Sequence, residues 1–494
     1  MFNFLKDFLL DRSFQGLLYQ LLYFLSPSTR NTSENIKFPV QSTLFADDLN
    51  ILCRGKNPNS IQSALQDTLD SLLKWSTKTG FTFSATKSRC TLFTRLRKYN
   101  NLEVKLNNIP IPYTKIIKIL GITFDNKNTW QAHLKDIRKA TLIKLNIIKS
   151  LAHTSWGANG TTLKQIYKSL ILSKLEYGAF IYIDAKQSAL KMIETIHNSG
   201  LRLATGAFRS SPISSILNIA NTLPLDLRRM QNSTLQKARR IHNNTTSNLE
   251  NTIKLNNFKF NCSGVLKHEH AITPPWVMEL HSNTDLSQHI KSETMDYTFR
   301  NLTLSLLEDY QDYIKFYTDG SKTEAGVGAS PYIGIPGNET ADTYAKRAIT
   351  SPEASLVQIC SLGDIKGVLQ SLTLQQWQHR WTSSLTKLNV IKPSINPWPT
   401  LTTKRRHEVI VNRLRIGHTW LTHNFLMRHE DPTQCTTCGE IITVEHVLLH
   451  CRKYADTKTS LNIPDHLYEI LGPDLKNFNN TLMFLQQTKL YNLI

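Results

Sequence analysis

Leu44-Phe-Ala-Asp-Asp-Leu-Asn50 is the stretch that says most about how this chain folds. Three apolar residues lead into the neighbouring carboxylates Asp47 and Asp48, and apolar residues resume after them. This pattern predicts a strand, a tight turn and a returning strand. Neighbouring carboxylates repel each other, but a pair of Mg²⁺ ions would account for them, because Mg²⁺ prefers carboxylate and phosphate oxygens. The alternative is a solvated turn, in which Asp is common.

The charge balance indicates a polyanionic partner. The 494 residues are enough for several domains, and 58 Lys and Arg against 38 Asp and Glu give a net charge of +20. Such an excess favours RNA or DNA, which bind through phosphate neutralisation and counterion release. A ribosome-associated protein or one bound to an anionic membrane surface would have a similar balance.

The apolar run from Gly16 to Leu25 is too short to span a bilayer, and no small-residue cleavage site follows it. We therefore expect no membrane insertion and no secretion. Seven cysteines, three of them near the C-terminus, favour a reducing compartment and a metal site over a disulfide framework. Nuclear or cytoplasmic localisation follows as an expectation; the oligomeric state is not indicated.

After the acidic hairpin, the apolar spacing from Ile61 to Trp75 predicts an amphipathic helix packed on the sheet. Phe81, Phe83 and the Leu92–Phe93 pair then predict paired strands around a turn that carries Lys87. An ordinary surface lysine is the alternative for Lys87.

Residues 130–250 predict mainly helices. The first has an apolar stripe and several cations, and its candidate phosphate contacts are Lys135, Arg138 and Lys139. A solvated helix face is the alternative. The stripe comprises Leu134, Ile137, Leu142, Leu145 and Ile148. The polar stretch from Asn243 to Asn251 predicts a boundary, and we expect a linker over 251–311.

Two aspartates mark a further segment. Asp319 ends a strand pattern, with Gly320 and Ser321 turning the chain, and Asp342 follows within Pro336–Lys346. Residues 320–341, 22 positions, separate them. Two unrelated surface turns would be the alternative to a shared site.

The C-terminal region combines a basic stretch with a cysteine cluster. Arg413 and Arg415, close to Trp420, suit phosphate contacts and base stacking. Cys435-x2-Cys438-x7-His446-x4-Cys451 offers three thiolates and an imidazole for a closed tetrahedral Zn²⁺ site. His450 is a second candidate imidazole, and reduced cysteines without metal are the alternative. Trp377 and Trp381, four residues apart, predict a helix core.

These motifs together resemble a known family. Phe45-Ala-Asp-Asp48 resembles the polymerase box of reverse transcriptases, and the segment from Trp75 to Lys87 resembles the motif whose lysine can protonate the leaving pyrophosphate. Lys118–Asp125, with Trp130 and His133, resembles the motif that holds the primer. The order matches the polyprotein of jockey-type non-LTR retrotransposons (LINEs). Around Asp319 and Asp342 the chain resembles the opening and closing motifs of type 1 ribonuclease H, and a CCHC zinc knuckle follows that domain in several such elements.

The resemblance implies an α+β multidomain chain. We expect an N-terminally truncated reverse-transcriptase palm over 1–128, a helical thumb and connection over 129–250, and an incomplete ribonuclease H α/β segment over 312–350. A mostly helical region with a small zinc site is expected over 365–494. His446 is the imidazole that the family pattern favours.

The resemblance also implies an RNA-directed DNA polymerase with RNA–DNA hybrid ribonuclease activity, with Asp47, Asp48, Asp319 and Asp342 as remnant Mg²⁺ ligands. We expect a catalytically defective product, because the family's first catalytic aspartate would precede Met1 and the central ribonuclease H carboxylates are missing. A Gly-Ser-Pro-x-Ser template motif is also absent from 16–29. The alternatives are a nucleic-acid-binding protein that uses the basic helices and the CCHC element, and an enzyme completed by another chain.

Overall fold

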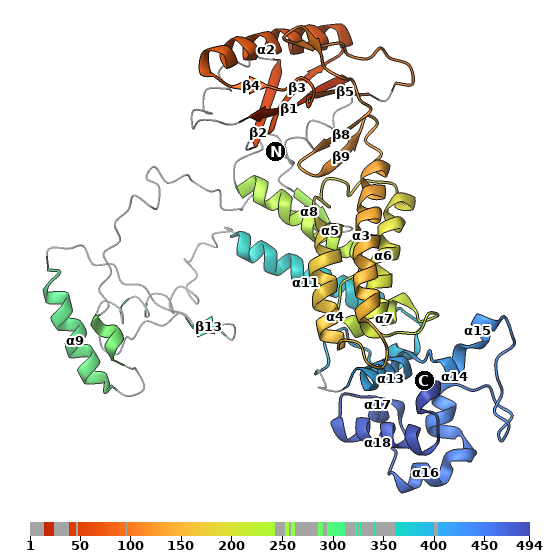
Figure 1. The fold of residues 1–494 in the computed structure, drawn as a ribbon. Helices are drawn as coiled ribbons and strands as arrows, with labels where there is room; N and C mark the ends of the chain where they lie inside the picture. Colours follow the sequence, from red (N-terminus) through yellow and green to blue (C-terminus); the bar gives the residue numbers. More distant parts are fainter. Residues whose placement is uncertain are drawn as a thin grey trace. The chain divides into compact units, whose positions relative to one another are not determined.

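The computed structural model describes residues 14–23, 39–45, 48–94, 96–242, 252–255, 258–261, 285–289, 294–311, 322–323, 326–327, 340, 343, 361–399 and 404–494 (Figure 1). The chain divides into two compact units. The first comprises Met1–Ala238, Ile253–Lys259 and Asp364–Ile494, and the second comprises Arg239–Thr252 and Phe260–Gly363.

The acidic hairpin forms as predicted. Strand β2 (Val40–Phe45) pairs antiparallel with β3 (Asp48–Gly55), and Phe45 lies opposite Asp48, so two residues connect the strands. These two, Ala46 and Asp47, lie outside the described residues.

Strand β1 (Phe14–Tyr23) is the central strand of this sheet. It pairs with β3 along one edge, and with β4 (Thr82–Phe83) and β5 (Arg89–Phe93) in succession along the other. The sequence predicted that the two strands around Lys87 pair with each other. In the structure both pair with β1 instead, because an uninterrupted β1 offers hydrogen-bonding groups along its whole edge.

Helix α2 (Pro58–Thr79) packs on one face of the sheet, in the register that its apolar spacing predicts. Ile61, Leu65 and Leu69 share a core with Leu49 and Ile51 of β3. Leu52 points to the opposite face and joins a different core, as the two-residue period of a strand requires. The helix ends at Gly80, whose φ of 79° is the left-handed conformation that glycine adopts readily.

Two short hairpins extend this region: β6 (Lys105–Leu106) with β7 (Ile109–Pro110), and β8 (Ile116–Ile119) with β9 (Ile122–Asp125). Leu120 and Gly121 form the second turn with φ of 46° and 81°. Positive φ at both turn positions gives the twist that a two-residue hairpin needs. The side chain of Tyr177 donates a hydrogen bond to the Leu120 carbonyl oxygen (2.6 Å), which ties this turn to the following helices.

Helices dominate residues 131–242, as predicted. They are α3 (Gln131–Leu151), α4 (Gly160–Tyr167), the π-helical η2 (Lys168–Leu172), α5 (Ser173–Glu176), α6 (Gln187–Thr205), α7 (Ile213–Ala220) and α8 (Leu225–His242). In the buried stripe of α3 the prediction was wrong at Leu142, which is 40% exposed. Thr141 is fully buried there instead, and its hydroxyl donates to the Ile137 carbonyl oxygen (2.7 Å).

The C-terminal region contributes to two cores, one shared with these helices and one built from residues of 391–494 alone. Trp377 and Trp381 of α11 are buried in the same core as residues of α3, α4 and α6, which confirms their prediction as core residues. The elements here are α11 (Leu362–Thr382), α12 (Lys387–Ile391), α13 (Arg405–Ile416), α14 (Trp420–His423), α15 (Phe425–Arg428), η5 (His446–His450), η6 (Arg452–Tyr454), α16 (Ala455–Ser460), α17 (Leu467–Ile470), α18 (Leu475–Gln487) and η7 (Tyr491–Leu493).

The stretch expected to be a linker contains regular structure. Its elements are β10 (Thr252–Leu255), β11 (Phe258–Asn261), the 3₁₀ turn η4 (Asp285–Gln288) and α9 (Asp296–Glu308). Further on, β12 (Lys322–Thr323) pairs with β13 (Gly326–Val327), so the described chain reversal comes after Gly320 and Ser321, which lie outside the described residues. None of the described helices is long and apolar enough to cross a bilayer.

Candidate metal centre and nucleic-acid interface

The sheet brings two of the candidate catalytic residues to the same end. Asp48 begins β3, is half-buried and lies opposite Leu21 of β1. The turn that carries the exposed Lys87 lies between β4 and β5, along the other edge of the same part of β1. Strand β1 therefore lies between β3, which carries Asp48, and the two strands that flank this turn. Asp47 belongs to the same hairpin but lies outside the described residues.

Residues of the primer-motif resemblance hold the fold together. The Asp125 side chain accepts hydrogen bonds from the backbone N–H groups of Thr129 (3.0 Å) and Trp130 (2.8 Å) and so shapes the entry into α3. His133 is buried, and its Nδ1 accepts from the backbone N–H of Thr123 (3.3 Å). Burial lowers the pKa of His133 to about 4, so the ring is neutral near pH 7.

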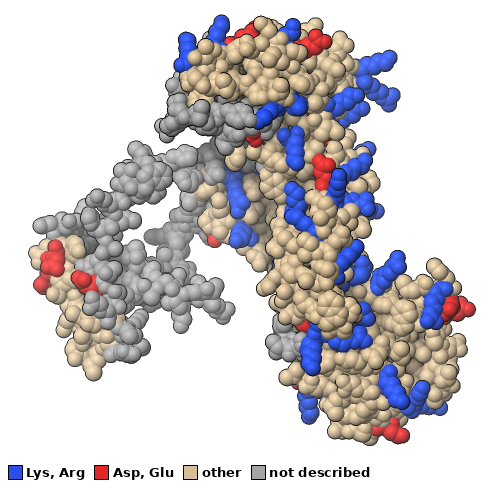
Figure 2. Space-filling model, viewed as in Figure 1, with Lys and Arg blue, Asp and Glu red and all other residues tan. Residues whose placement is uncertain are grey.

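One face of α3 is basic and exposed. Lys135, Arg138 and Lys139 are all exposed, while Leu134 and Ile137 of the opposite face are buried. Figure 2 shows Lys and Arg side chains recurring along the visible surface of the helical region, with few acidic ones among them. None of the three α3 cations forms an ion pair within the part of the chain that the structure describes.

Sequence reasoning missed an aromatic side chain just after α3. Trp156 is 72% exposed, and its ring stacks on that of His153 with centroids 4.7 Å apart. Exposed rings of this kind can stack on nucleic-acid bases. The available signal was a tryptophan in a polar, glycine-containing connection between two helices.

Arg413 and Arg415 contact the protein itself. Arg413 donates to the carbonyl oxygens of Gly206 (2.9 Å) and Ile494 (2.7 Å). Arg415 is only 9% exposed and donates to the carbonyl oxygens of Leu471 (2.7 Å) and Gly472 (2.8 Å). Burial lowers the pKa of each to about 10, which still leaves both charged at neutral pH. Because these contacts hold both side chains against the protein, neither residue belongs to the exposed α3 surface proposed below.

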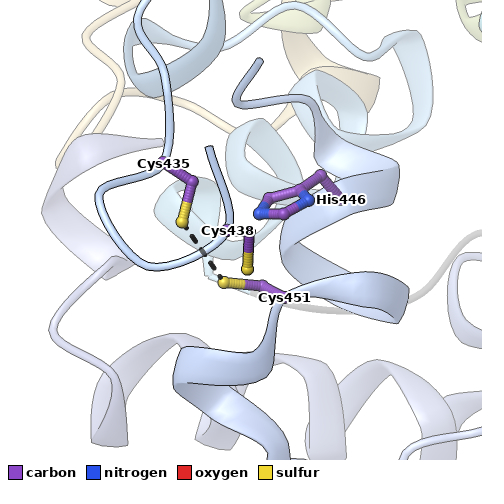
Figure 3. Close-up of side chains that lie close together, drawn as sticks. All are labelled: Cys435, Cys438, His446 and Cys451. Atoms are coloured by element: carbon purple, nitrogen blue, oxygen red, sulfur yellow. Dashed lines mark hydrogen bonds between the residues drawn. The ribbon is translucent and has the colours of Figure 1, made fainter. Parts of the chain in front are cut away.

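The predicted zinc ligands come together. The Sγ atoms of Cys435, Cys438 and Cys451 and a ring nitrogen of His446 all lie within 4.8 Å of one another (Figure 3). Cys435 and Cys438 flank a tight turn, closed by hydrogen bonds from Gly439 N to Cys435 O (2.8 Å) and from Cys435 N to Glu440 O (2.7 Å). The five cysteines that the structure describes are all free, as expected.

The His446 ring is oriented for a metal. Its Nδ1 lies 2.7 Å from a carboxylate oxygen of Glu440, which fixes the N–H on that nitrogen. Its Nε2 is buried and has no hydrogen-bond partner among the described residues. A carboxylate, a histidine and a metal in this order are common at zinc sites, and a zinc ion would satisfy the orphaned nitrogen. The spacing of the cysteines and histidine along the chain gave no sign that Glu440 orients the His446 ring. His450 is exposed and is not part of the cluster.

The surroundings shift the pKa values of two of these thiols in opposite directions. The adjacent His446 ring and hydrogen bonds from the backbone N–H groups of Thr437 and Cys438 lower the pKa of Cys435 to about 6. Burial raises the pKa of Cys451 to about 11. A divalent cation would stabilise both thiolates, so the donor set and its surroundings fit Zn²⁺.

Comparison with known proteins agrees with the resemblance. No protein-family model matches the chain. A probable RNA-directed DNA polymerase from transposon X-element of Drosophila melanogaster is 26% identical over 162 residues, which are 33% of this chain and 18% of that protein. The RNA-directed DNA polymerase from mobile element jockey of the same species is 29% identical over 196 residues, 38% of this chain and 21% of that protein.

Part of this chain is homologous to RNA-directed DNA polymerases of non-LTR retrotransposons. A Pol polyprotein from a type-1 retrotransposable element R1 of Nasonia vitripennis, 25% identical over 125 residues, belongs to the same group; the match covers 25% of this chain and 32% of that protein. The homology supports the reverse-transcriptase origin inferred from Phe45–Asp48, at modest identity over about a third of the chain. The matches span only about a fifth to a third of these relatives.

The ribonuclease H resemblance remains a prediction. Asp319 and Asp342, its candidate carboxylates, both lie outside the described residues. The pairing of β12 with β13 is compatible with a return strand at Gly326 and carries no information about metal binding.

Proposed function

We propose that this chain is a nucleic-acid-binding product derived from a retrotransposon reverse transcriptase. RNA, DNA or their hybrid would lie against the exposed basic face of α3, defined by Lys135, Arg138 and Lys139. The observation that carries the proposal is this face: three exposed cations of one helix that form no ion pair among the described residues, in a chain homologous to RNA-directed DNA polymerases. Nuclear or cytoplasmic localisation follows from such partners.

Electrostatics support α3 as the helix that contacts the nucleic-acid phosphates. Exposed cations gain most from phosphates when no carboxylate competes for them, and each phosphate contact releases counterions. The buried residues on the other side of the helix keep its axis fixed, so the three charges form a rigid row. Trp156 follows in the next loop and supplies a ring for base stacking.

The zinc element would stabilise the fold of the C-terminal region. Cys435, Cys438, His446 and Cys451 would form a closed tetrahedral site without an open position for water, as structural zinc sites do. Its contribution to binding would then be indirect, through the packing of the region around α13.

We further propose that the chain alone does not turn over as a polymerase or a nuclease. Mg²⁺-dependent phosphoryl transfer needs several converging carboxylates. Asp47 and Asp48 would hold one side of such a site, with Lys87 near the leaving pyrophosphate. Two internal features support a defect: the missing template motif over 16–29 and the 22 residues between Asp319 and Asp342, which leave little room for the central ligands of a ribonuclease H domain.

Binding and catalysis can be tested on the same purified chain. RNA binding, followed by fluorescence anisotropy across a salt series, should weaken with a logarithmic slope of about −0.7 per phosphate contact. Primer extension on an RNA template with Mg²⁺ should give no product above that of Asp47→Asn. Salt-independent or absent RNA binding would refute the proposed interface. Extension that Asp47→Asn abolishes would refute the proposed catalytic defect.

A further inference from the structure

A cavity of about 280 Å³ lies within the first unit, between the start of α4, the end of α6, α7 and α13. Its volume is at the lower end of the range for small-molecule sites. Among the described residues, the cations that line it are Lys164, Lys392 and Arg415, and Glu408 is the only carboxylate in its lining. It does not overlap with α3 or with the zinc cluster.

Lys392 is the central feature of this cavity. Its side chain is 4% exposed, and its Nζ donates to Oδ1 of Asn218 (2.6 Å) and lies 5.5 Å from the ring centroid of Trp398. No carboxylate pairs with it among the residues that the structure describes. Burial, together with the nearby Arg415, lowers the pKa of Lys392 to about 8, so the ammonium form still predominates at neutral pH.

Arg415 supplies a second buried charge beside it. Its guanidinium carbon lies 4.5 Å from the centroid of the same Trp398 ring. The carbonyl oxygens of Leu471 and Gly472 accept its N–H groups but do not neutralise its charge. Glu408 offsets only part of this excess, because it also accepts from the backbone N–H of Gly160 (2.8 Å) and lies 3.6 Å from Arg405.

Two buried cations that have no carboxylate partner among the described residues are unfavourable unless an anion joins them. A phosphate monoester carries up to two negative charges near neutral pH and so matches both cations, whereas a backbone phosphodiester carries one. The side-chain amides of Asn218 and Asn412 also line the cavity. Each Nδ2 already donates to a backbone carbonyl oxygen, that of Ser394 (3.3 Å) or Thr205 (3.0 Å), and has a second N–H that can donate to a phosphate oxygen. Trp398, which is partly exposed, can contact an attached base.

We propose that this cavity binds the phosphate monoester of a nucleotide through Lys392 and Arg415. The monoester belongs either to a free nucleoside monophosphate or to the 5′ end of an RNA strand. The site is separate from the α3 interface, because no residue of α3 lines the cavity.

The test is calorimetric titration of the full chain with inorganic phosphate, a nucleoside 5′-monophosphate, and a short RNA carrying either a 5′-phosphate or a 5′-hydroxyl. Lys392→Met keeps the length of the side chain and removes its charge, and should weaken phosphate binding at least about tenfold. Glu408→Gln removes the opposing charge and should strengthen binding several-fold. Lys476→Met, at an exposed lysine of α18, is the matched control and should change nothing.

The outcomes separate the two sources. Tighter binding of the monophosphate than of inorganic phosphate, with no effect of the RNA 5′ group, supports a free nucleotide. A preference for 5′-phosphate over 5′-hydroxyl RNA supports an RNA end. The proposal is overturned if none of the phosphates binds at millimolar concentration. It is also overturned if neither Lys392→Met nor Glu408→Gln changes the affinity, and Glu408→Gln decides the matter should Lys392→Met fail to fold.

Discussion

Helices α3 and α13 are both basic, yet they use their charges in different ways. On α3, Lys135, Arg138 and Lys139 are exposed and form no ion pair among the described residues. On α13, Arg413 and Arg415 donate to carbonyl oxygens of the protein. The charge pattern of a helix therefore does not reveal whether its cations serve a partner or the fold.

The difference arises from what surrounds each helix. Helix α3 has one buried face, so its other face stays in water. Around α13, the end of α6, the C-terminal residue and the segment after α17 all present carbonyl oxygens. Helix ends and chain ends have carbonyls without intrahelical partners, and a guanidinium can satisfy two of them at once.

The largest expected effect comes from removing zinc, which should loosen the side of the molecule around α13 and spare α3. Val444, Val447 and Leu448, next to the ligands, share a core with Ile410 and Leu414 of α13. Structural zinc contributes about 10 kcal/mol or more in zinc-finger peptides, so chelation should abolish hydrogen-exchange protection over 435–454. Protection measured by mass spectrometry should fall in α13 and stay unchanged in α3.

A histidine pair provides the control for this prediction. His446→Gln should lower the zinc content of the purified chain, whereas His450→Gln, four residues later and exposed, should not. Equal zinc content in the two variants, or equal protection with and without the chelator, would contradict the assignment of the site.

The next-largest expected effect is on the free energy of unfolding, when one arginine of α13 or one of α3 is replaced. Arg415→Met should lower the free energy of unfolding by about 3 kcal/mol, because two carbonyl groups lose a charged donor. Arg138→Met on α3 should change it by less than about 0.5 kcal/mol. Urea denaturation measures both, and equal losses of stability would remove the distinction drawn between the helices.

The buried face of α3 should respond to acid. Burial lowers the pKa of His133 to about 4, so the unfolded chain, in which it is near 6.5, takes up the proton first as pH falls. The stability that neutral His133 contributes is complete above about pH 6.5 and is lost towards pH 4, and this loss reaches about 2 kcal/mol between pH 7 and pH 5.

His133→Asn keeps an acceptor for the Thr123 N–H and cannot titrate, so the difference in unfolding free energy between pH 7 and pH 5 should shrink by that amount. His153→Asn, at an exposed ring, should leave the difference unchanged. If His133→Asn retained the full pH dependence, other groups would be responsible; burial also lowers the pKa values of His418 and His423 to about 4.

The smallest effect on stability should accompany a clear effect on binding. Replacing Lys135, Arg138 and Lys139 together with Gln should reduce the salt slope of RNA binding by about 2, at about 0.7 per lost contact. Unfolding free energy should move by less than about 0.5 kcal/mol. The same change at Lys56, Lys74 and Lys78, exposed on or beside α2, is the matched control. If the triple substitution at Lys56, Lys74 and Lys78 weakens RNA binding equally, the loss of binding would be due to net charge and not to the α3 face.

Local patterns could be predicted from the sequence. The β2–β3 hairpin, α2 and the buried tryptophans of α11 follow from apolar spacing and turn residues, because each depends on neighbours a few positions away. The zinc ligands were predictable for the same reason, since Cys-x2-Cys at a turn directs two sulfurs to one point. The helix α9, within an expected linker, was missed because its apolar spacing is weak.

Tertiary structure decided what depends on distant segments. The sequence determined where cations and helices lie along the chain, but a backbone N–H of Gly160 meets Glu408, 248 positions away, and that proximity encloses the cavity around Lys392. The roles of Arg415 and Glu440 likewise depend on which carbonyl or imidazole the fold brings near them. Burial is a property of the assembled core, so no local pattern of residues determines whether a charge ends in water or inside the protein.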